Sequence, residues 1–274
     1  MPVSPHSPVA ALERLRARLG TLAERIDLEW VAECASTNSV LSERAPQTTT
    51  RPLVLVADHQ RAGRGRRGRQ WQSWPERSLT FSLQWHFPAG TPAPAGLSLV
   101  AGLAVANCLQ QLGAIGVQLK WPNDVLINGD KLAGILVELQ LGRARSLNAV
   151  IGIGLNLALP AATDLEQQRG VSDLARALPD GAPDRVELLA LILGELVTLL
   201  ERYGETGFAP LKPGWEALNA FARLPVRISG EGLTLDGLCL GVDDDGALLL
   251  ATEHGKERIL SGEVSLRPLM EESR

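Results

Sequence analysis

The chain has 274 residues, of which 45% are hydrophobic and 21% are charged. These proportions are typical of a globular protein with one large core or two domains, and they exclude collagen-like, coiled-coil and wholly disordered chains. No stretch contains the roughly 18 uninterrupted apolar residues of a membrane-spanning helix, so we expect no integral membrane protein. The net charge of −4 argues against nucleic-acid binding over the whole surface.

The start of the chain carries no basic and then apolar leader, so we expect no secretory signal. The three cysteines, Cys34, Cys108 and Cys239, are far apart in the sequence, cannot all pair and fit no zinc spacing. Both features are typical of the reducing cytoplasm, and we expect the protein to be cytoplasmic.

The N-terminal third begins with an apolar stripe that predicts an amphipathic helix over residues 8–26. A strand over residues 28–32 follows, and Ser36-Thr37-Asn38 is suited to cap a short helix after it. The apolar run 53–57 predicts a buried strand, which leads into a loop over residues 58–75.

The middle of the chain contains a strand over residues 79–87, whose alternating pattern predicts burial on one face only. A core helix is predicted over 97–112 and a second long helix over 184–203. Asn128-Gly129 predicts a two-residue hairpin turn. The strands expected between the two helices are 117–121, 125–128, 132–141 and 146–157.

The last part of the chain changes character near Phe221. Short strands separated by glycine-containing turns predict a small antiparallel barrel there. The strands expected in it are 224–229, 233–242, 247–251 and 257–260. For the main domain, the mixed order of helices and strands favours an α+β fold with a mixed central sheet over a doubly wound sheet.

An intensely basic segment, Arg61-Ala62-Gly63-Arg64-Gly65-Arg66-Arg67-Gly68-Arg69, precedes Gln70-Trp71. Its glycines allow close backbone approach, its arginines can clamp phosphate or carboxylate, and Trp71 can stack on a purine. A flexible Arg/Gly tail that binds RNA is the alternative. The position directly after a buried strand favours a small-molecule phosphate site, although no P-loop motif is present.

A second set of motifs is Lys120-Trp121-Pro122-Asn123-Asp124 followed by Lys131-Leu132-Ala133-Gly134-Ile135-Leu136-Val137-Glu138. Lys131 at the start of an apolar strand can stabilise charge on a transferring phosphoryl group, and Gly134 leaves room for a flat ligand. Asp124 can hold a divalent metal. Two alternatives stay open: Lys131 as an ordinary hairpin lysine and Asp124 as a turn cap.

A third motif, Val150-Ile151-Gly152-Ile153-Gly154-Leu155-Asn156, is only superficially similar to a dinucleotide-binding fingerprint, because it lacks the third glycine and the following helix. We interpret it as a closely packed strand that presents Asn156 to a ligand. The four histidines show no metal-type pairing, and no Gly-x-Ser-x-Gly nucleophile motif occurs.

Together these motifs resemble the biotin–protein ligase family. They occur in the family's order between residues 28 and 157, and the predicted C-terminal barrel also fits. The resemblance implies an N-terminal helical extension over residues 1–26. It implies a biotin/lipoate ligase-like catalytic domain over 27–220 and an SH3-like barrel over 221–274.

The resemblance also implies a two-step reaction that uses ATP, biotin and Mg²⁺. Biotin would be activated as biotinyl-5′-adenylate and then transferred to a lysine on the biotin carboxyl carrier domain of a carboxylase, such as acetyl-CoA carboxylase. Lys131 and Arg66 would be catalytic, and Asp124 would hold the metal. Biotin contacts are implied for Ser36, Thr37, Asn38, Gln60, Gly63, Arg64, Gly65, Arg66, Lys131, Gly134, Leu136, Gly152 and Gly154. Nucleotide contacts are implied for Arg66, Arg69, Trp71, Asn123, Lys131 and Asn156.

Some members of that family begin with a winged helix-turn-helix and repress genes. About thirty residues precede the first predicted strand, which is too few for such a module, so we expect a ligase without a repressor role and without specific DNA binding. The competing hypotheses are a lipoate or octanoate ligase, a nucleic-acid-binding protein that uses Arg61–Arg69, and an inactive biotin-binding module. A monomer and a homodimer are both compatible with the sequence.

Overall fold

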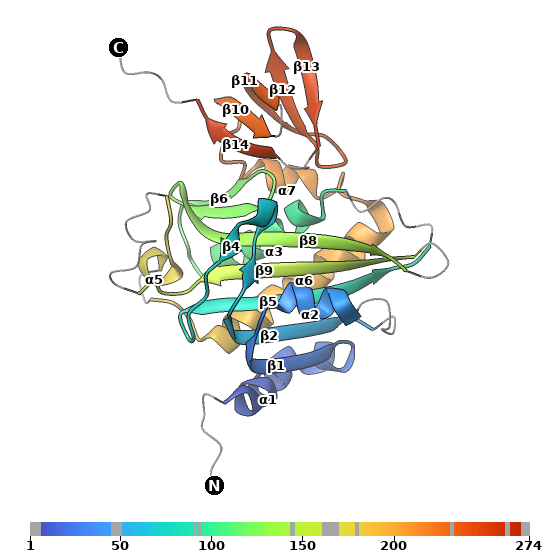
Figure 1. Ribbon diagram of the computed structural model, residues 1–274, viewed down its shortest axis with the longest axis vertical. Coiled ribbons are helices and arrows are strands. Elements are labelled where there is room, and N and C mark those ends of the chain that lie inside the picture. The colour runs from blue at the N-terminus through green and yellow to red at the C-terminus, as the bar shows by residue number, and fades with distance from the viewer. Residues whose placement is uncertain are drawn as a thin grey trace.

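The computed structural model describes residues 7–44, 51–89, 91, 95–142, 146–160, 170–178, 181–230, 233–260 and 264–269. Its centre is a seven-stranded sheet in the order β1-β2-β5-β9-β8-β7-β6 (Figure 1). β1 and β2 pair in parallel and every other neighbouring pair is antiparallel, so the predicted mixed sheet is confirmed. The strands are β1 (Asp27–Cys34), β2 (Leu53–Gln60), β5 (Ser78–Phe87), β6 (Val117–Lys120), β7 (Asp124–Ile127), β8 (Asp130–Leu141) and β9 (Leu147–Asn156).

Long helices cover one face of this sheet (Figure 1). They are α3 (Leu97–Gln111) and α6 (Arg185–Thr206), with α1 (Pro8–Leu19) packed on α6 and β1. Asp184 caps α6 by accepting hydrogen bonds from the N–H groups of Val186 and Glu187, which would otherwise lack partners. The apolar faces of these helices and of the sheet form the main core.

The opposite face carries only small elements and therefore stays open enough for a site. α2 (Thr37–Arg44) lies on β2, β5, β8 and β9 above a small apolar cluster. Beside it lies a hairpin of β3 (Gly63–Arg64) and β4 (Gln70–Trp71), whose tip contains the 3₁₀ turn Arg66–Gly68 (Figure 1).

Two local predictions were wrong. β5 was expected to be buried on one face, but seven successive residues from Ser78 to Gln84 are buried, because β5 is an interior strand with helices on one face and α2 on the other. The helix predicted over 8–26 ends at Leu19, because Gly20 takes a φ of 55°, and a 3₁₀ turn (Gly20–Glu24) continues the segment.

A second, antiparallel sheet of five strands lies at one end of the molecule, in the order β13-β12-β11-β10-β14 (Figure 1). This sheet confirms the predicted small C-terminal all-β unit. Its strands are β10 (Pro225–Gly230), β11 (Leu233–Val242), β12 (Leu248–Thr252), β13 (Gly255–Ile259) and β14 (Val264–Pro268). Besides the β3–β4 hairpin, which lies within the loop predicted over 58–75, three elements were not predicted: β14, α5 (Leu174–Ala177) and α7 (Lys212–Glu216). All three have five residues or fewer, too few for a recognisable period.

The two sheets meet at Trp121, which follows β6. Its side chain is 1% exposed, and its Nε1 donates to the carbonyl oxygen of Gly246, between β11 and β12, at 3.0 Å. A glycine is required there, because Gly246 has a φ of 80° and a Cβ at this position would stand 2.9 Å from the Cα of Gly96. This contact fixes the second sheet beside the β6–β7 turn.

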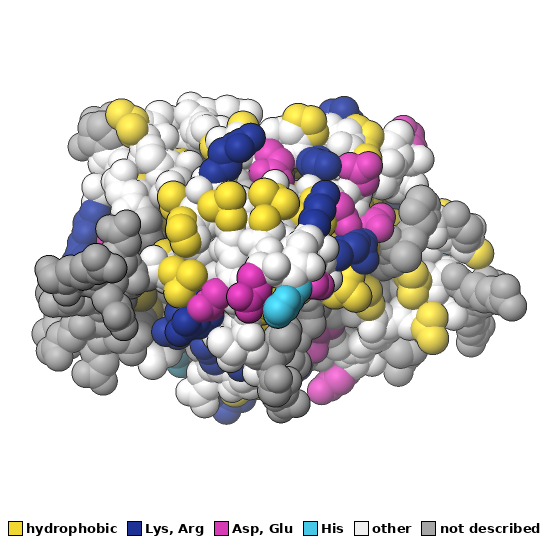
Figure 2. Space-filling view, turned by 90° about the horizontal axis from the view of Figure 1, so that it is seen from above, with side chains coloured by type: hydrophobic (Ala, Val, Ile, Leu, Met, Phe, Trp, Pro, Cys, Tyr) yellow, Lys and Arg dark blue, Asp and Glu magenta, His cyan; other side chains and the backbone are white. Residues whose placement is uncertain are grey.

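The end of the molecule formed by the second sheet presents apolar side chains in the middle of its surface, with charged side chains around them (Figure 2). The exposed large apolar residues of this unit include Leu238 and Leu240 on β11 and Leu260 after β13. Within the described part of the chain, no helix combines the length and the apolar character needed to cross a membrane.

Candidate active site

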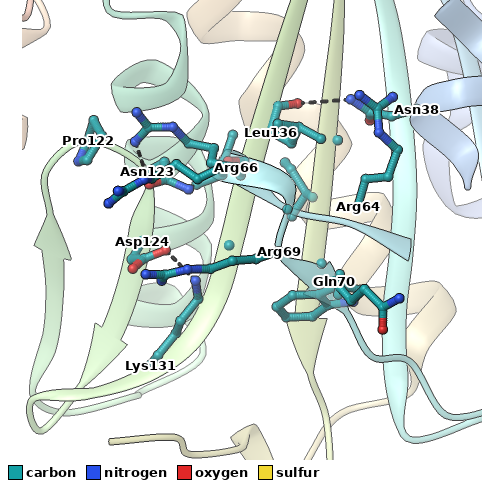
Figure 3. Close-up of a pocket in the computed structure, with 18 of the residues that line it drawn as sticks. Asn38, Arg64, Arg66, Arg69, Gln70, Pro122, Asn123, Asp124, Lys131 and Leu136 are labelled. Atoms are coloured by element: carbon teal, nitrogen blue, oxygen red, sulfur yellow. Dashed lines mark hydrogen bonds and ion pairs between the residues drawn. The ribbon is translucent and has the colours of Figure 1, made fainter. Parts of the chain in front are cut away.

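A pocket lies on the open face of the central sheet, between α2, the β3–β4 hairpin, the β6–β7 turn and β14 (Figure 3). It brings together almost all of the predicted site residues. These are Ser36, Thr37, Asn38, Gln60, Arg64, Gly65, Arg66, Arg69, Trp71, Asn123, Asp124, Lys131, Gly134, Leu136, Gly152 and Gly154. Gly63 and Asn156 do not line it; the side chain of Asn156 instead donates to the carbonyl oxygen of Ser172 at 3.0 Å.

One end of the pocket is a network of neutral polar groups under the N-terminus of α2. Gln60 Oε1 accepts a 2.7 Å hydrogen bond from the N–H of Thr37 and a 3.2 Å bond from its hydroxyl. Ser82 Oγ lies 2.7 Å from Thr37 Oγ1 and donates to Asn38 Oδ1 at 2.6 Å. Every residue of this network is buried, so these mutual bonds fix their orientation.

Sequence reasoning missed Ser82. The signal that could have found it is the run of polar residues at alternate positions of β5, Thr80, Ser82 and Gln84, which places three buried polar side chains on one face of a central strand. Such a row indicates a polar site on that face, because buried polar groups need partners.

Two glycines of β9 let side chains lie directly on the sheet. A Cβ at Gly152 would stand 2.0 Å from Asn38 Oδ1, and a Cβ at Gly154 would stand 2.3 Å from the ring of Trp71. The indole also lies against Gly134 on the neighbouring strand, 3.6 Å from where its Cβ would be. The glycines therefore leave a flat floor on this face of β9 and allow the close packing predicted for the strand.

The basic segment forms an ordered hairpin in place of the flexible tail that was the alternative. Gly63 pairs with Trp71 and Arg64 with Gln70, and the N–H of Gly65 donates to the carbonyl oxygen of Arg69 at 2.8 Å. The tip reverses through Arg67, whose φ is 59°, and the glycine after it.

Two arginines of the hairpin are held by partners on the sheet side of the pocket (Figure 3). Arg64 Nη2 lies 2.8 Å from Glu138 Oε1 on β8. Arg66 Nη1 donates to Asn123 Oδ1 at 3.1 Å, and Asn123 Nδ2 in turn donates to the carbonyl oxygen of Ile135 at 2.9 Å. The hairpin therefore reaches across the pocket to both sides.

Lys131 projects from the start of β8 into the pocket, where its Nζ lies 2.5 Å from Asp124 Oδ1 (Figure 3). Asp124 is the single carboxylate among the described residues that line the pocket. No group of three or more His, Cys, Asp or Glu residues that could hold a metal occurs in the described ranges. Among the described lining residues, Asp124 is therefore the one carboxylate that could bind a divalent cation, and it already pairs with Lys131.

The other end of the pocket collects positive charge that the protein does not neutralise. Arg69, Lys120 and Arg267 line the pocket, and within the described residues none of them forms an ion pair with a carboxylate. Burial lowers the pKa of Lys120; Asp124 opposes this shift, and the neighbouring Lys131 adds to it. Uncompensated cations around a cavity create a site for an anion with several charges.

Arg267 was also missed by sequence reasoning. It comes from β14 of the second sheet, which contributes Val264, Ser265 and Leu266 to the pocket as well. No local pattern marks it, because the strand reaches the pocket only through the packing of the two sheets.

Two donors in the pocket remain available for a ligand. Trp71 Nε1 is buried and has no hydrogen-bond partner among the described residues. Gln60 Nε2 has no acceptor among the described residues either, whereas its Oε1 accepts two hydrogen bonds. A buried donor such as Trp71 Nε1 is normally satisfied in the working state of a protein.

Comparison with protein-family models gives two matches. The biotin/lipoate A/B protein ligase family matches residues 31–156, and the biotin protein ligase C-terminal domain matches residues 225–267. The first match spans the strands that build the pocket, and the second spans the C-terminal sheet.

Individual relatives agree with these matches. The bifunctional ligase/repressor BirA of Escherichia coli is 38% identical over 85% of this chain and 71% of its own length. The biotin–[acetyl-CoA-carboxylase] ligase of Paracoccus denitrificans is 35% identical over 85% of this chain and 98% of its own. The solved biotin protein ligase of Aquifex aeolicus, in complex with biotin and ATP, superimposes with a TM-score of 0.77 at 32% identity and covers 89% of this chain and 99% of its own. The chain therefore belongs to the biotin–protein ligase family.

Proposed function

We propose that the protein is an ATP-dependent biotin–[acetyl-CoA-carboxylase] ligase. It would join biotin to ATP as biotinyl-5′-adenylate and then transfer biotin to a lysine of a biotin carboxyl carrier domain. The relative from Paracoccus denitrificans carries this name, and the solved relative from Aquifex aeolicus holds biotin and ATP. The observation that carries the proposal is one pocket with a neutral polar end, a cationic end and Lys131 in it.

Biotin would bind with its neutral ring system at the polar end. There the amide of Gln60 Nε2 and the hydroxyl of Ser36 can pair with the polar atoms of the ring, and the apolar strands β8 and β9 provide the floor. The carboxylate would extend toward Lys131 and Arg66. ATP would place its phosphates at the cationic end and its adenine against Trp71.

In the first step, a carboxylate oxygen of biotin attacks the α-phosphorus of ATP, the bond to the β-phosphate breaks, and pyrophosphate leaves. Lys131 and Arg66 stabilise the negative charge that builds up on the α-phosphate oxygens. The cations at Arg69, Lys120 and Arg267 hold the pyrophosphate. Magnesium, bound to the phosphates, would neutralise part of their charge.

In the second step, the neutral amine of the acceptor lysine attacks the carbonyl carbon of the adenylate. An amide bond forms, the carbon–oxygen bond to phosphate breaks, AMP leaves and the amine releases a proton. The protein supplies no covalent nucleophile. Its hairpin covers the pocket and excludes water, which would otherwise hydrolyse the adenylate.

We further propose that residues 27–220 form the catalytic domain, that residues 1–26 form a helical extension, and that residues 221–274 form a second domain that completes the site. Arg267 supports a catalytic contribution of the second domain, since it lines the same pocket as Lys131.

The proposal is tested by mixing the protein with ATP, Mg²⁺, biotin and a biotin carrier domain, and weighing the acceptor by intact mass spectrometry. We expect one biotinyl mass increment, and none when lipoate replaces biotin. Lys131→Met should lower the rate of adenylate formation by about 10²–10³-fold, because one well-placed donor is lost. Lys256→Met removes an exposed lysine on β13 and should leave the rate unchanged.

Failure to modify the carrier despite tight biotin binding would favour an inactive biotin-binding module. Modification with lipoate would favour a lipoate ligase. Absence of both binding and modification would contradict the proposed function.

A further inference from the structure

Glu138 on β8 is a carboxylate that touches three segments at once. Its Oε1 accepts from Arg64 Nη2 at 2.8 Å, and its Oε2 lies 3.3 Å from Arg64 Nη1 and accepts from Asn38 Nδ2 at 3.0 Å. Ser42 Oγ lies 3.5 Å from the same Oε2. One carboxylate thus joins the hairpin, α2 and the central sheet.

The side chain of Glu138 is not part of the pocket lining, but both of its main partners are. Asn38 and Arg64 line the pocket near Leu136, to whose carbonyl oxygen Asn38 Nδ2 also donates at 3.2 Å (Figure 3). Any effect of Glu138 on a ligand must therefore pass through these two residues.

The hairpin also contacts the body of the protein in other ways: the indole of Trp71 lies on Gly154 and Gly134, and Arg64 Nη1 donates to Ser39 Oγ at 3.3 Å. β3 and β4 pair only with each other, forming a separate two-stranded sheet. At its far end, Arg66 bonds Asn123, and just after it Ser73 Oγ accepts from the N–H of Gln60 at 2.9 Å. The two-point contact between Arg64 and Glu138 is a bidentate ion pair that joins the hairpin to the middle of the sheet, and bidentate pairs are stronger than single contacts.

We propose that Glu138 is a positioning residue that holds the β3–β4 hairpin closed over the pocket through Arg64, and so slows the release of bound ligand. This role rests on the proposed function for the identity of the ligand, whereas the effect of Glu138 on the hairpin is measured without any ligand. Loss of the carboxylate lets the hairpin open more often, while the groups around Lys131 keep their places.

The test compares Glu138→Gln with Glu33→Gln. Glu33 is a matched control because it also pairs with an arginine beside the hairpin, Arg61 Nε at 3.1 Å, yet does not line the pocket or touch a residue that does. In the ligand-free protein, Glu138→Gln should speed amide hydrogen exchange over residues 63–71 by about fivefold, as expected for a partly exposed pair, and Glu33→Gln should not.

With biotin as the probe, Glu138→Gln should raise the dissociation rate by about fivefold and raise the KM for biotin, with kcat for adenylate formation within about twofold of wild type. If wild type does not bind biotin, the proposed function fails, and the exchange measurement alone still decides the role of Glu138.

The same substitution made in an Arg64→Ala protein distinguishes positioning through Arg64 from a general stabilising role of Glu138. In an Arg64→Ala protein, Glu138→Gln should have no further effect on hairpin exchange, because its partner is already absent. Unchanged exchange in Glu138→Gln alone would overturn the proposal. An effect of equal size in both backgrounds would overturn it too, since Glu138 would then act by holding α2.

Discussion

The two ends of the pocket differ in whether their side chains have bonding partners within the described part of the protein. At the polar end, Thr37, Asn38, Gln60 and Ser82 bond one another within the folded chain. At the cationic end, Arg69, Lys120 and Arg267 face the cavity, and within the described ranges none of them pairs with a carboxylate.

This difference separates two tasks. The polar end is organised before any ligand arrives, so it can select a small neutral ring by shape and hydrogen bonds at little further cost in ordering. The cations at the other end repel one another until a polyanion binds. Binding relieves this repulsion, so this end contributes electrostatic free energy only when the anion is bound. Under the proposed function, the groups that recognise the ring of biotin and the cations that attract the phosphates of ATP therefore lie in different parts of one cavity.

Of the substitutions that compare the two ends, Gly154→Ala should give the largest effect, because it acts where the two ends meet. The new Cβ would lie 2.3 Å from the indole of Trp71 and displace it. Overpacking of this kind costs about 1–3 kcal/mol, so kcat/KM for ATP should fall by about tenfold to a hundredfold, with a smaller change for biotin. Steady-state adenylation with each substrate varied measures this difference.

Gly194→Ala is the matched control for that substitution. Gly194 lies in α6, and a Cβ there would meet nothing within 4 Å, so kinetics should be unchanged and stability slightly raised. Equal losses for ATP and biotin in Gly154→Ala would show that the two ends are not separate.

Ser82→Ala tests the polar end. Removing this hydroxyl leaves Asn38 Oδ1 buried without its donor, so the free energy of unfolding should fall by about 1–3 kcal/mol. Urea unfolding measures it. Thr198→Ala is the control, because it removes an exposed hydroxyl bonded to the carbonyl oxygen of Gly194. It should change the free energy of unfolding by less than about 0.5 kcal/mol. An equally small change in Ser82→Ala would contradict a preorganised polar end.

Lys120→Met tests the cationic end and should have the smallest effect. Burial lowers the pKa of Lys120 below its usual 10.5, against the opposing charge of Asp124. Between the lowered pKa and 10.5 the unfolded chain therefore holds more protons, and unfolding free energy rises with pH through that window. Lys120→Met should remove this rise and increase the KM for ATP by a few-fold.

Urea unfolding of both proteins from pH 7 to pH 10.5 measures that contribution. Burial also raises the pKa of the Cys108 thiol to about 12, which lowers stability above pH 9, but this contribution is common to both proteins and cancels in their difference. If the difference in unfolding free energy between the two proteins did not change with pH, the lowered pKa of Lys120 would be contradicted.

The sequence predicted those parts of the site that lie in continuous motifs. Asn128-Gly129 makes the predicted hairpin turn, with φ of 49° and 86° at its two residues, because those residues tolerate positive φ. Gly152 and Gly154 allow the predicted close packing on β9, since alternate glycines in a strand leave one face without side chains. Lys131 and the arginine hairpin meet in the pocket as expected.

The parts that could not be predicted depend on contacts between segments far apart in the chain. Arg267 reaches the pocket only because β14 pairs with β10 on the side of its sheet nearest the β6–β7 turn. Glu138 was singled out only as the end of a motif, and its role follows from the approach of Arg64, 74 residues earlier. The local sequence pattern carries no information on contacts between residues that lie so far apart in the chain.

The order of the strands also has a consequence for synthesis on the ribosome. β14 is the last described strand, and it supplies Arg267 to a pocket whose other walls come from residues 36–154. A nascent chain can assemble the central sheet and the polar end well before that strand emerges, and gains its full set of pocket-lining cations only near the end of translation. Shortened products that stop before β14 would keep the ring-binding half of the cavity and leave the edge of β10 without its partner.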